Sequence, residues 1–339
     1  MTSSVPLSGV EQTAIDAAWL RAIESRRADR LFHDPYAEVF ADAAPGVLPR
    51  EMPDEHAALL EMARLQVVVR TRFFDDYLLC ACADGLRQVV LLGAGLDARG
   101  FRLAWPDGVR LFELDLPEVL SLKNSVQAGE AMAPRCERVV VPVDLRTDWC
   151  TALIMAGFDT AAPTVWLAEG LFVYLSTDEV TRLVGVVSRL SAPGSRMSFE
   201  YGIADGAPAA DRPASPLDQV AALRKGGPYV YVNASGRLAR QGWQIRTHDA
   251  AGFAASCGLA VEGHAIGGFL TAKRDTAPTD SLADGVETVG GECEHQFDET
   301  ARVGEWHTYS TSRSWLSTTR PGGSPPMSGE GRTTRSMRC

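Results

Sequence analysis

The sequence predicts an α/β fold in which helices cover both faces of a mostly parallel sheet. From Gln88 onward, short apolar segments alternate with amphipathic ones, which is the pattern of repeated strand–helix–strand units. The first apolar run, Val89 to Leu92, is followed at once by Gly93-Ala94-Gly95. A buried strand that ends in a tight glycine turn before a helix is typical of such folds.

Residues 10–84 are expected to be helical. Apolar residues recur at helical spacing in 13–25, and a long amphipathic pattern occupies 59–82. His33-Asp34-Pro35-Tyr36 indicates a turn between the two. We therefore expect an N-terminal helical cap over residues 1–86, ahead of the sheet.

The sequence pattern indicates five strands followed, after an interruption, by two more. The first five, 88–93, 109–114, 138–143, 164–168 and 195–201, alternate with helices at 97–103, 117–128, 148–156 and 177–190. Thr177 is the candidate N-cap of the last of these helices. A segment rich in Ala, Pro and Gly, 203–240, then interrupts the pattern, with a helix expected near 217–223. Two final strands, 243–248 and 259–273, flank a short helix at 249–257.

The composition changes after Arg274. Gly, Ser, Thr and Pro dominate 317–336, and no periodic apolar pattern remains there. Because such a segment cannot bury enough apolar surface to order itself, we expect 275–339 to be a disordered tail. The sheet domain is then expected to occupy 87–274, with 203–240 as an insertion.

The overall composition excludes several classes of partner. A hydrophobic content of 45% with 22% charged residues is typical of a soluble globular protein. The formal net charge of −10 argues against binding nucleic acid or an anionic membrane surface. No apolar run approaches the ~18 residues of a membrane span, and the start lacks a signal-peptide pattern. Scattered cysteines without a Cys-x-x-Cys pair favour reduced thiols in the cytoplasm and no metal site, and the oligomeric state stays open.

The glycine turn indicates a nucleoside-binding site. Its backbone N–H groups are not covered by side chains, so a ligand can lie directly against the main chain. Gly93, Gly95 and Ala98 also match the dinucleotide fingerprint Gly-x-Gly-x-x-Ala, so the motif alone leaves the ligand open. The next helix is short, because Trp105-Pro106-Asp107-Gly108 breaks it, whereas dinucleotide sites usually point a longer helix at the pyrophosphate. A nucleoside without phosphates suits this geometry better.

Acidic residues follow three neighbouring strands. Asp115, Asp144 and Glu169 each come at the end of an apolar strand, at the edge where open α/β sheets bind ligands. One such carboxylate is commonly a helix cap, but a series of them favours a cofactor site. Asp115 is placed to accept hydrogen bonds from both ribose hydroxyls of an adenosine.

Several segments together resemble the motifs of a known family. They are LGAGLDARGFRL, FELDLPEVL, VPVDLRTDW and WLAEGLFVYL, with AIESRRADRLFHDPYA near the start. Over about 13–274 the chain resembles the leucine carboxyl methyltransferase family, especially its actinobacterial branch, which includes polyketide O-methyltransferases. The resemblance implies a class I methyltransferase fold, Rossmann-like with a seven-stranded sheet whose last strand is antiparallel, and S-adenosyl-L-methionine as the cofactor. The branch usually has GLDTRAFR, whereas this chain has Ala98 and Gly100 in place of Thr and Ala.

The resemblance also implies roles for individual residues. The cofactor is expected to contact Gly93, Gly95, Asp115 at the ribose, Asp144 and Leu145 at the adenine, and Glu169 at the methionyl end. Arg70 corresponds to the arginine that binds the cofactor carboxylate, a task that suits a bidentate guanidinium. Arg72 is equally reachable from the same helix.

The expected reaction is O-methylation of a carboxyl group on a small, polyketide-like acid of secondary metabolism. A carboxylate is already ionised near pH 7 and needs no general base, and no nucleophile motif follows the strands. A phenolic acceptor would need a base, for which His33, His248 and His264 are the weak candidates. Tyr174 could line the acceptor pocket or simply pack, so the catalytic residue stays unassigned. The N-terminal helices and 203–240 are expected to form the acceptor pocket and a lid.

Two alternatives remain open at this stage. One is an NAD(P)-dependent oxidoreductase, because the glycine pattern also satisfies that fingerprint. The other is a catalytically silent protein that keeps the cofactor site, to which Ala98 and Gly100 give some weight.

Overall fold

The computed structural model describes residues 9–51, 54, 57–201, 225, 230–261 and 267–275. All of them belong to one structural unit of the chain. The helix expected near 217–223, His264, and the expected tail beyond residue 275 lie outside the described residues.

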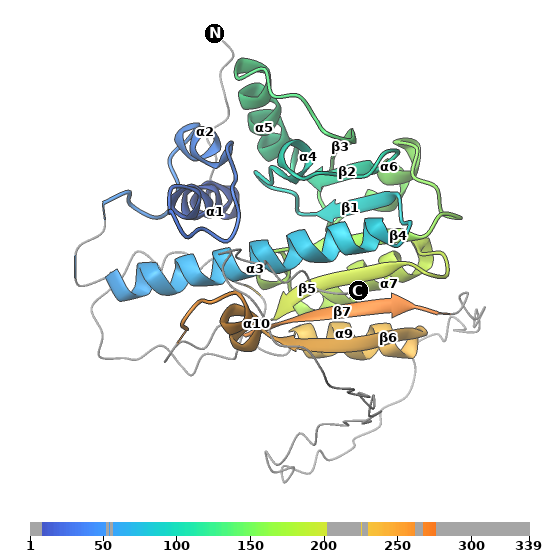
Figure 1. The fold of residues 1–339 in the computed structure, drawn as a ribbon. Helices are drawn as coiled ribbons and strands as arrows, with labels where there is room; N and C mark the ends of the chain where they lie inside the picture. Colours follow the sequence, from blue (N-terminus) through green and yellow to red (C-terminus); the bar gives the residue numbers. More distant parts are fainter. Residues whose placement is uncertain are drawn as a thin grey trace, which may run out of the picture. The chain divides into compact units, whose positions relative to one another are not determined.

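A seven-stranded sheet with the order β3-β2-β1-β4-β5-β7-β6 lies at the centre of this unit (Figure 1). Its strands are β1 (Gln88–Leu92), β2 (Arg110–Asp115), β3 (Glu137–Pro142), β4 (Thr164–Ala168), β5 (Arg196–Tyr201), β6 (Trp243–Asp249) and β7 (Gly268–Arg274). The strands from β3 to β5 in this order pair in parallel, whereas β7 is antiparallel to both β5 and β6. The mostly parallel sheet and its antiparallel last strand are therefore confirmed.

The strand order reverses at β1, which pairs with β2 on one side and β4 on the other. Leu91 lies level with Glu113 of β2 and Leu167 of β4, so these three strands end at the same edge. In open α/β sheets the crevice at such a switch point, beyond the carboxyl ends of the strands, binds the ligand.

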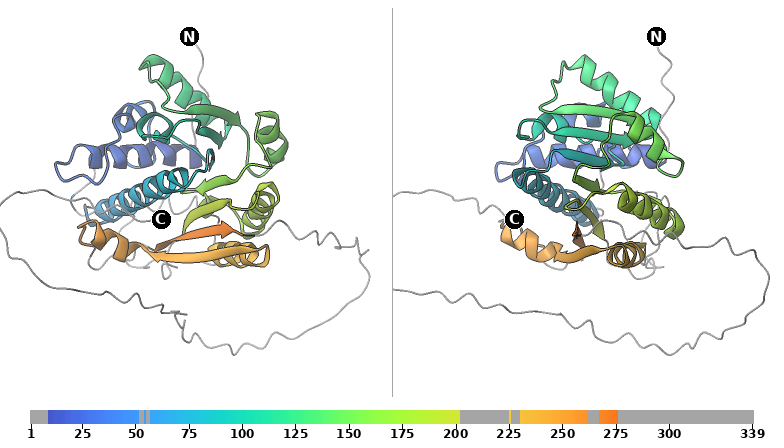
Figure 2. Two further views of the ribbon diagram at one scale, coloured as in Figure 1. Left: turned by 45° about the vertical axis from the view of Figure 1, so that its right-hand side comes forward. Right: turned by 90° about the vertical axis from the view of Figure 1, so that its right-hand side faces the viewer.

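Helices cover both faces of the sheet (Figure 2). One face packs against α3 (Ala57–Ala83) and α10 (Ala250–Ser256), and the other against α6 (Trp149–Met155), α7 (Thr177–Leu190) and α9 (Val230–Arg240). Alternate residues of β1 divide between the two cores, with Val89 on the α3 side and Val90 on the α7 side. Helix α9, inside the segment expected as an insertion, contributes to this core.

Local sequence features set the helix ends. Helix α7 begins with a capping box, in which the Ser176 side chain accepts from the Glu179 N–H and the Glu179 side chain accepts from the Ser176 N–H. The N-cap is therefore Ser176 and not the expected Thr177. Helix α3 ends at Ala83. Gly85 follows with a φ of 98°, a conformation that favours glycine, and the Leu86 N–H bonds back to the Ala81 carbonyl.

The first helices pack near the glycine turn. Helices α1 (Val10–Ser25) and α2 (Ala37–Asp42), both within the region expected to be helical, form an apolar cluster with α4 (Arg99–Arg102), centred on Ile15, Phe40 and Phe101. Helix α4 is as short as expected. No helix in the described part of the chain is long and apolar enough to cross a membrane. A separate helical cap over 1–86 stays a prediction.

Candidate active site

A cavity of about 260 Å³ lies at the switch point of the sheet. Most of its lining comes from the turn after β1, the ends of β2, β4 and β5, one face of α1, and one face of α3. The 3₁₀ helix after β4, α10 and β7 add further residues. The described lining residues that carry charge are Glu11, Arg21, Arg70, Asp97, Asp115, Glu169 and Glu200. The five carboxylates outnumber the two arginines, so the lining is suited to a ligand that carries positive charge.

The glycine turn forms one wall of the cavity. Gly93 has a φ of 70° and Gly95 a φ of 44°, conformations that other residues rarely adopt. A Cβ on Gly93 would lie 3.1 Å from Leu171 Cδ1, and one on Gly95 would lie 3.4 Å from Ala14 Cβ. The two glycines therefore let the main chain itself face the ligand.

Asp115 ends β2 directly opposite this turn and lines the cavity. Its Oδ2 accepts the Gly95 N–H, and its Oδ1 accepts the Leu116 N–H at 2.7 Å. These fixed donors orient the carboxylate, and burial raises the pKa of the Asp115 carboxyl. Glu113, two residues earlier, is fully buried and pairs with Lys123 at 2.9 Å and with Arg138 at 2.7 Å. Of these two acids on β2, Asp115 is the one available to a ligand.

A cluster of one arginine and two glutamates lies on the other side of the cavity. Arg70 Nε is 3.2 Å from Glu169 Oε1, and its Nη1 is 3.9 Å from Glu200 Oε1. Gly170, with a φ of 67°, follows Glu169, and its N–H donates to Glu200. Arg72 instead bonds Asp76 and a backbone carbonyl. The structure thus brings Arg70, and not Arg72, into the cavity.

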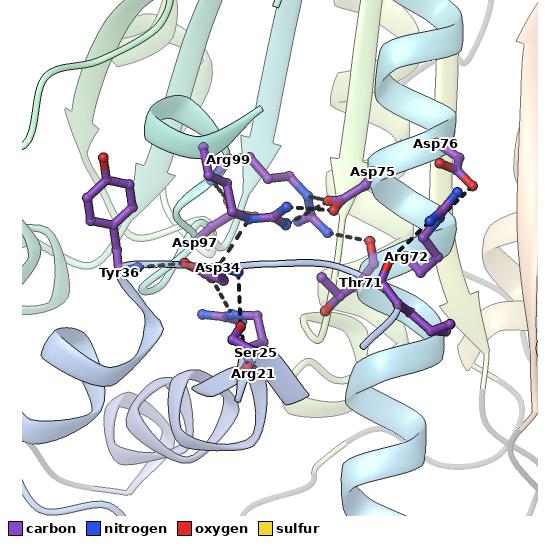
Figure 3. A network of polar contacts seen from close by, with 12 residues as sticks. Arg21, Ser25, Asp34, Tyr36, Thr71, Arg72, Asp75, Asp76, Asp97 and Arg99 are labelled. Carbon is purple, nitrogen blue, oxygen red and sulfur yellow. Dashed lines mark hydrogen bonds and ion pairs between the residues drawn. The ribbon is translucent and has the colours of Figure 1, made fainter. Parts of the chain in front are cut away.

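Arg99 connects Glu169 to a chain of ion pairs, and Figure 3 shows its members Asp75, Asp97 and Arg99. Arg99 is 2% exposed and bonds Asp97, Asp75 at 2.7 Å and Glu169 Oε2 at 2.6 Å. Arg102 extends the chain from Asp75. Because these residues come from α3, α4 and the end of β4, the pairs fix the three elements to one another beside the cavity.

The expected adenine residues do not line this cavity. The Asp144 carboxylate pairs with Arg146 at 2.6 Å, and that hydrogen-bonded guanidinium lowers the pKa of Asp144. Leu145 packs against the apolar core on the α7 side. Their role at the adenine stays a prediction.

Of the described candidates for a catalytic acid or base, one lines the cavity and the two histidines do not. Tyr174, in the 3₁₀ helix η2 (Phe172–Tyr174), lines the cavity. His33 is exposed and outside the lining. His248 lies beside Phe73 and contacts Thr271 Oγ1 at 2.9 Å, and burial lowers the pKa of its ring. Neither described histidine therefore reaches the cavity.

The sequence analysis missed several charged residues at the site, among them Glu11, Arg21 and Asp97 of the lining, and also Glu200 and Arg99. Glu200 lies at the carboxyl end of β5, so the same strand-end rule that singled out Glu169 could have found it. Arg99 shows no such signal, because nothing in a single sequence indicates that an arginine on a short helix is buried.

The chain was compared with known proteins. The family model described as leucine carboxyl methyltransferase matches residues 14–188. The chain belongs to this family. A provisionally named S-adenosyl-L-methionine-dependent methyltransferase of Parafrankia sp. (strain EAN1pec) is 46% identical over 274 residues, covering 79% of this chain and 88% of the relative. A relative with the same type of name from Frankia alni is 44% identical over 269 residues, covering 79% and 95%.

Solved structures give a weaker likeness. A crystal structure of a provisionally named methyltransferase from Thermobifida fusca covers 81% of this chain and 97% of its own, with 19% identity and a TM-score of 0.47.

The protein is therefore an S-adenosyl-L-methionine-dependent methyltransferase with a class I fold. The chemistry of the lining is compatible with this cofactor, because the glycine turn leaves the main chain uncovered, Asp115 is an available carboxylate, and Arg70 lies beside acidic residues. The family match and the relatives favour a methyltransferase over the two alternatives, an NAD(P)-dependent oxidoreductase and a catalytically silent protein.

Proposed function

We propose that this methyltransferase acts on an oxygen atom, and specifically on the carboxyl group of a small, polyketide-like acid. One observation carries the proposal: the described residues that line the cavity include no His, Cys or Lys. A carboxylate acceptor is ionised near neutral pH, so it needs no such group as a base. A place in secondary metabolism belongs to the same proposal, on the ground of the family resemblance. Cys80 is disulfide-bonded, so the expectation that all cysteines are reduced is wrong, and a cytoplasmic location stays a prediction.

Individual residues are assigned roles in this proposal. Asp115 accepts hydrogen bonds from the ribose hydroxyls, and Arg70 binds the methionyl carboxylate as a bidentate donor. Gly93 and Gly95 let the cofactor approach the main chain. Asp144 and Leu145, which lie outside the lining, keep the adenine role only as an expectation.

The cofactor, when bound, supplies an electrophilic methyl group on a sulfonium. The chain then has to align the acceptor oxygen with that methyl and exclude water. Val69, Tyr174 and Phe269 line the cavity and give apolar surface for the body of an acceptor. Because the acceptor carboxylate is itself the nucleophile, no residue of the lining has to take a proton in this scheme.

The chemical stability of the product tests the proposal. The enzyme is incubated with methyl-labelled cofactor and paired aromatic acceptors, each pair consisting of a carboxylic acid and the phenol that lacks the carboxyl group. We expect label only in the acids, and mild alkali should release it as methanol, because methyl esters saponify. Label that resists alkali, or that appears equally in the phenols, would refute a carboxyl acceptor while leaving the methyltransferase activity intact.

A further inference from the structure

Glu200 is a carboxylate in the cavity to which no role has yet been given. It is the last residue but one of β5. The strands β4 and β5 are parallel neighbours, with Ala168 level with Phe199, so Glu169 and Glu200 follow side by side at the same edge. Both side chains face Arg70, which comes from α3.

The two glutamates differ in what their oxygens contact. Both oxygens of Glu169 are bound by arginines, Oε1 by Arg70 at 3.2 Å and Oε2 by Arg99 at 2.6 Å. Glu200 Oε1 accepts the Gly170 N–H. Its Oε2 is buried and has no hydrogen-bond partner among the described residues. Since an unpaired buried acceptor is costly to keep, this atom indicates a donor that the ligand supplies.

We propose that Glu200 binds the ammonium group of the cofactor's methionyl end. The ammonium and carboxylate of an amino acid are joined through one carbon, and Glu200 Oε1 lies 3.9 Å from Arg70 Nη1, which suits both ends of such a zwitterion. An ammonium carries three N–H donors, whereas a sulfonium carries none, so an oxygen that lacks a donor favours the ammonium. Arginines bind both oxygens of Glu169, which holds Arg70 in place, and the expected contact of Glu169 with the methionyl end stays a prediction.

The electrostatic surroundings of Glu200 agree with this assignment. Burial raises the pKa of the Glu200 carboxyl, Arg70 lowers it, and the neighbouring Glu169 raises it further. A cation that approaches Oε2 relieves that repulsion. The inference concerns the cofactor alone and does not depend on which acceptor is methylated.

Calorimetric titration with three ligands tests the inference without turnover. 5′-Methylthioadenosine has the nucleoside and thioether but no amino acid, S-adenosylhomocysteine adds the amino acid, and S-adenosylmethionine adds the sulfonium charge. For Glu200→Gln we expect S-adenosylhomocysteine and S-adenosylmethionine to bind at least about tenfold more weakly, by the same factor, because a hydrogen bond between two charged groups is lost. Binding of 5′-methylthioadenosine should change less than about twofold.

Glu130→Gln is the matched control, because it removes one negative charge from the exposed C-cap of helix α5 (Pro117–Gly129), and it should leave all three affinities unchanged. Unaltered binding of S-adenosylhomocysteine to Glu200→Gln would overturn the inference. Equal weakening of all three ligands would also overturn it, since the site as a whole would be damaged. Weakening of S-adenosylmethionine alone would assign Glu200 to the sulfonium instead.

A melting curve shows whether each variant is folded. If Glu200→Gln is not, Glu200→Asp supports the same comparison, because it keeps the charge and moves it by one methylene. Wild-type protein that bound none of the three ligands would refute the cofactor assignment, a result distinct from a failure of this inference.

Discussion

The replacement of Asp115 by Asn tests how the cofactor sugar is held. Asp115 lines the cavity, and its two oxygens are oriented by the N–H groups of Gly95 and Leu116. Asn has nearly the same size and keeps one carbonyl oxygen, so one of these backbone bonds can persist. The charge and the second acceptor are lost. The change therefore removes ribose binding capacity without opening a hole in the site.

The expected loss of cofactor affinity follows from the hydrogen bonds that the substitution removes. A hydrogen bond to a charged group contributes about 1.5–3 kcal/mol. The loss of one of the two ribose bonds of Asp115 should weaken cofactor binding roughly 10- to 150-fold. Because burial raises the pKa of Asp115, removing its charge should not itself destabilise the fold at neutral pH.

Isothermal titration with S-adenosylhomocysteine measures the effect directly. Glu118→Gln is the control, since Glu118 is an exposed acid in the first turn of α5, three residues from Asp115. The affinity of this variant for S-adenosylhomocysteine should not change. Affinity of Asp115→Asn within threefold of wild type, about 0.7 kcal/mol, would refute the ribose assignment. Glu113 could not bind the ribose in place of Asp115, because the Glu113 carboxylate is buried in ion pairs with Lys123 and Arg138.

Three further changes, the first with a control variant, test the structure around the cavity. Arg99→Met should lower the free energy of unfolding in urea by about 3–5 kcal/mol, because the buried Asp75 and the half-buried Asp97 and Glu169 lose a partner. Arg110→Met, at a partly exposed pair with Glu137, should cost less than about 1 kcal/mol; equal losses would contradict the network. Glu200→Gln should melt above wild type at pH 8. Since the folded-state pKa of Glu200 is raised, its charge disfavours folding at high pH, and the difference should vanish as the pH falls to the ordinary glutamate pKa; a constant difference would contradict this. Gly93→Ala should lower cofactor affinity in the same titration, because its φ is 70° and the new Cβ would crowd Leu171; unchanged binding would show that the turn tolerates a side chain.

The local sequence was sufficient for the part of the site that one chain segment builds. The apolar run of β1 ending in Gly93 and Gly95 is a contiguous signal, and Asp115 follows the next apolar strand directly. Both depend on the period-two pattern of buried strands and on backbone conformations that require glycine. The capping error at α7 was of one residue, because Ser176 and Thr177 are both good caps and only the hydrogen bond to Glu179 distinguishes them.

The sequence by itself therefore determined the order of strands and helices, the glycine turn and the acid opposite it. Tertiary structure decided which arginine of α3 enters the cavity, because Arg70 and Arg72 project from different sides of the helix and only packing settles which side faces the sheet edge. It also decided the partners of Glu169, since Arg70 lies 99 positions away and Arg99 lies 70 positions away. Contacts over such distances arise from the folded arrangement of the elements, and no local periodicity encodes them.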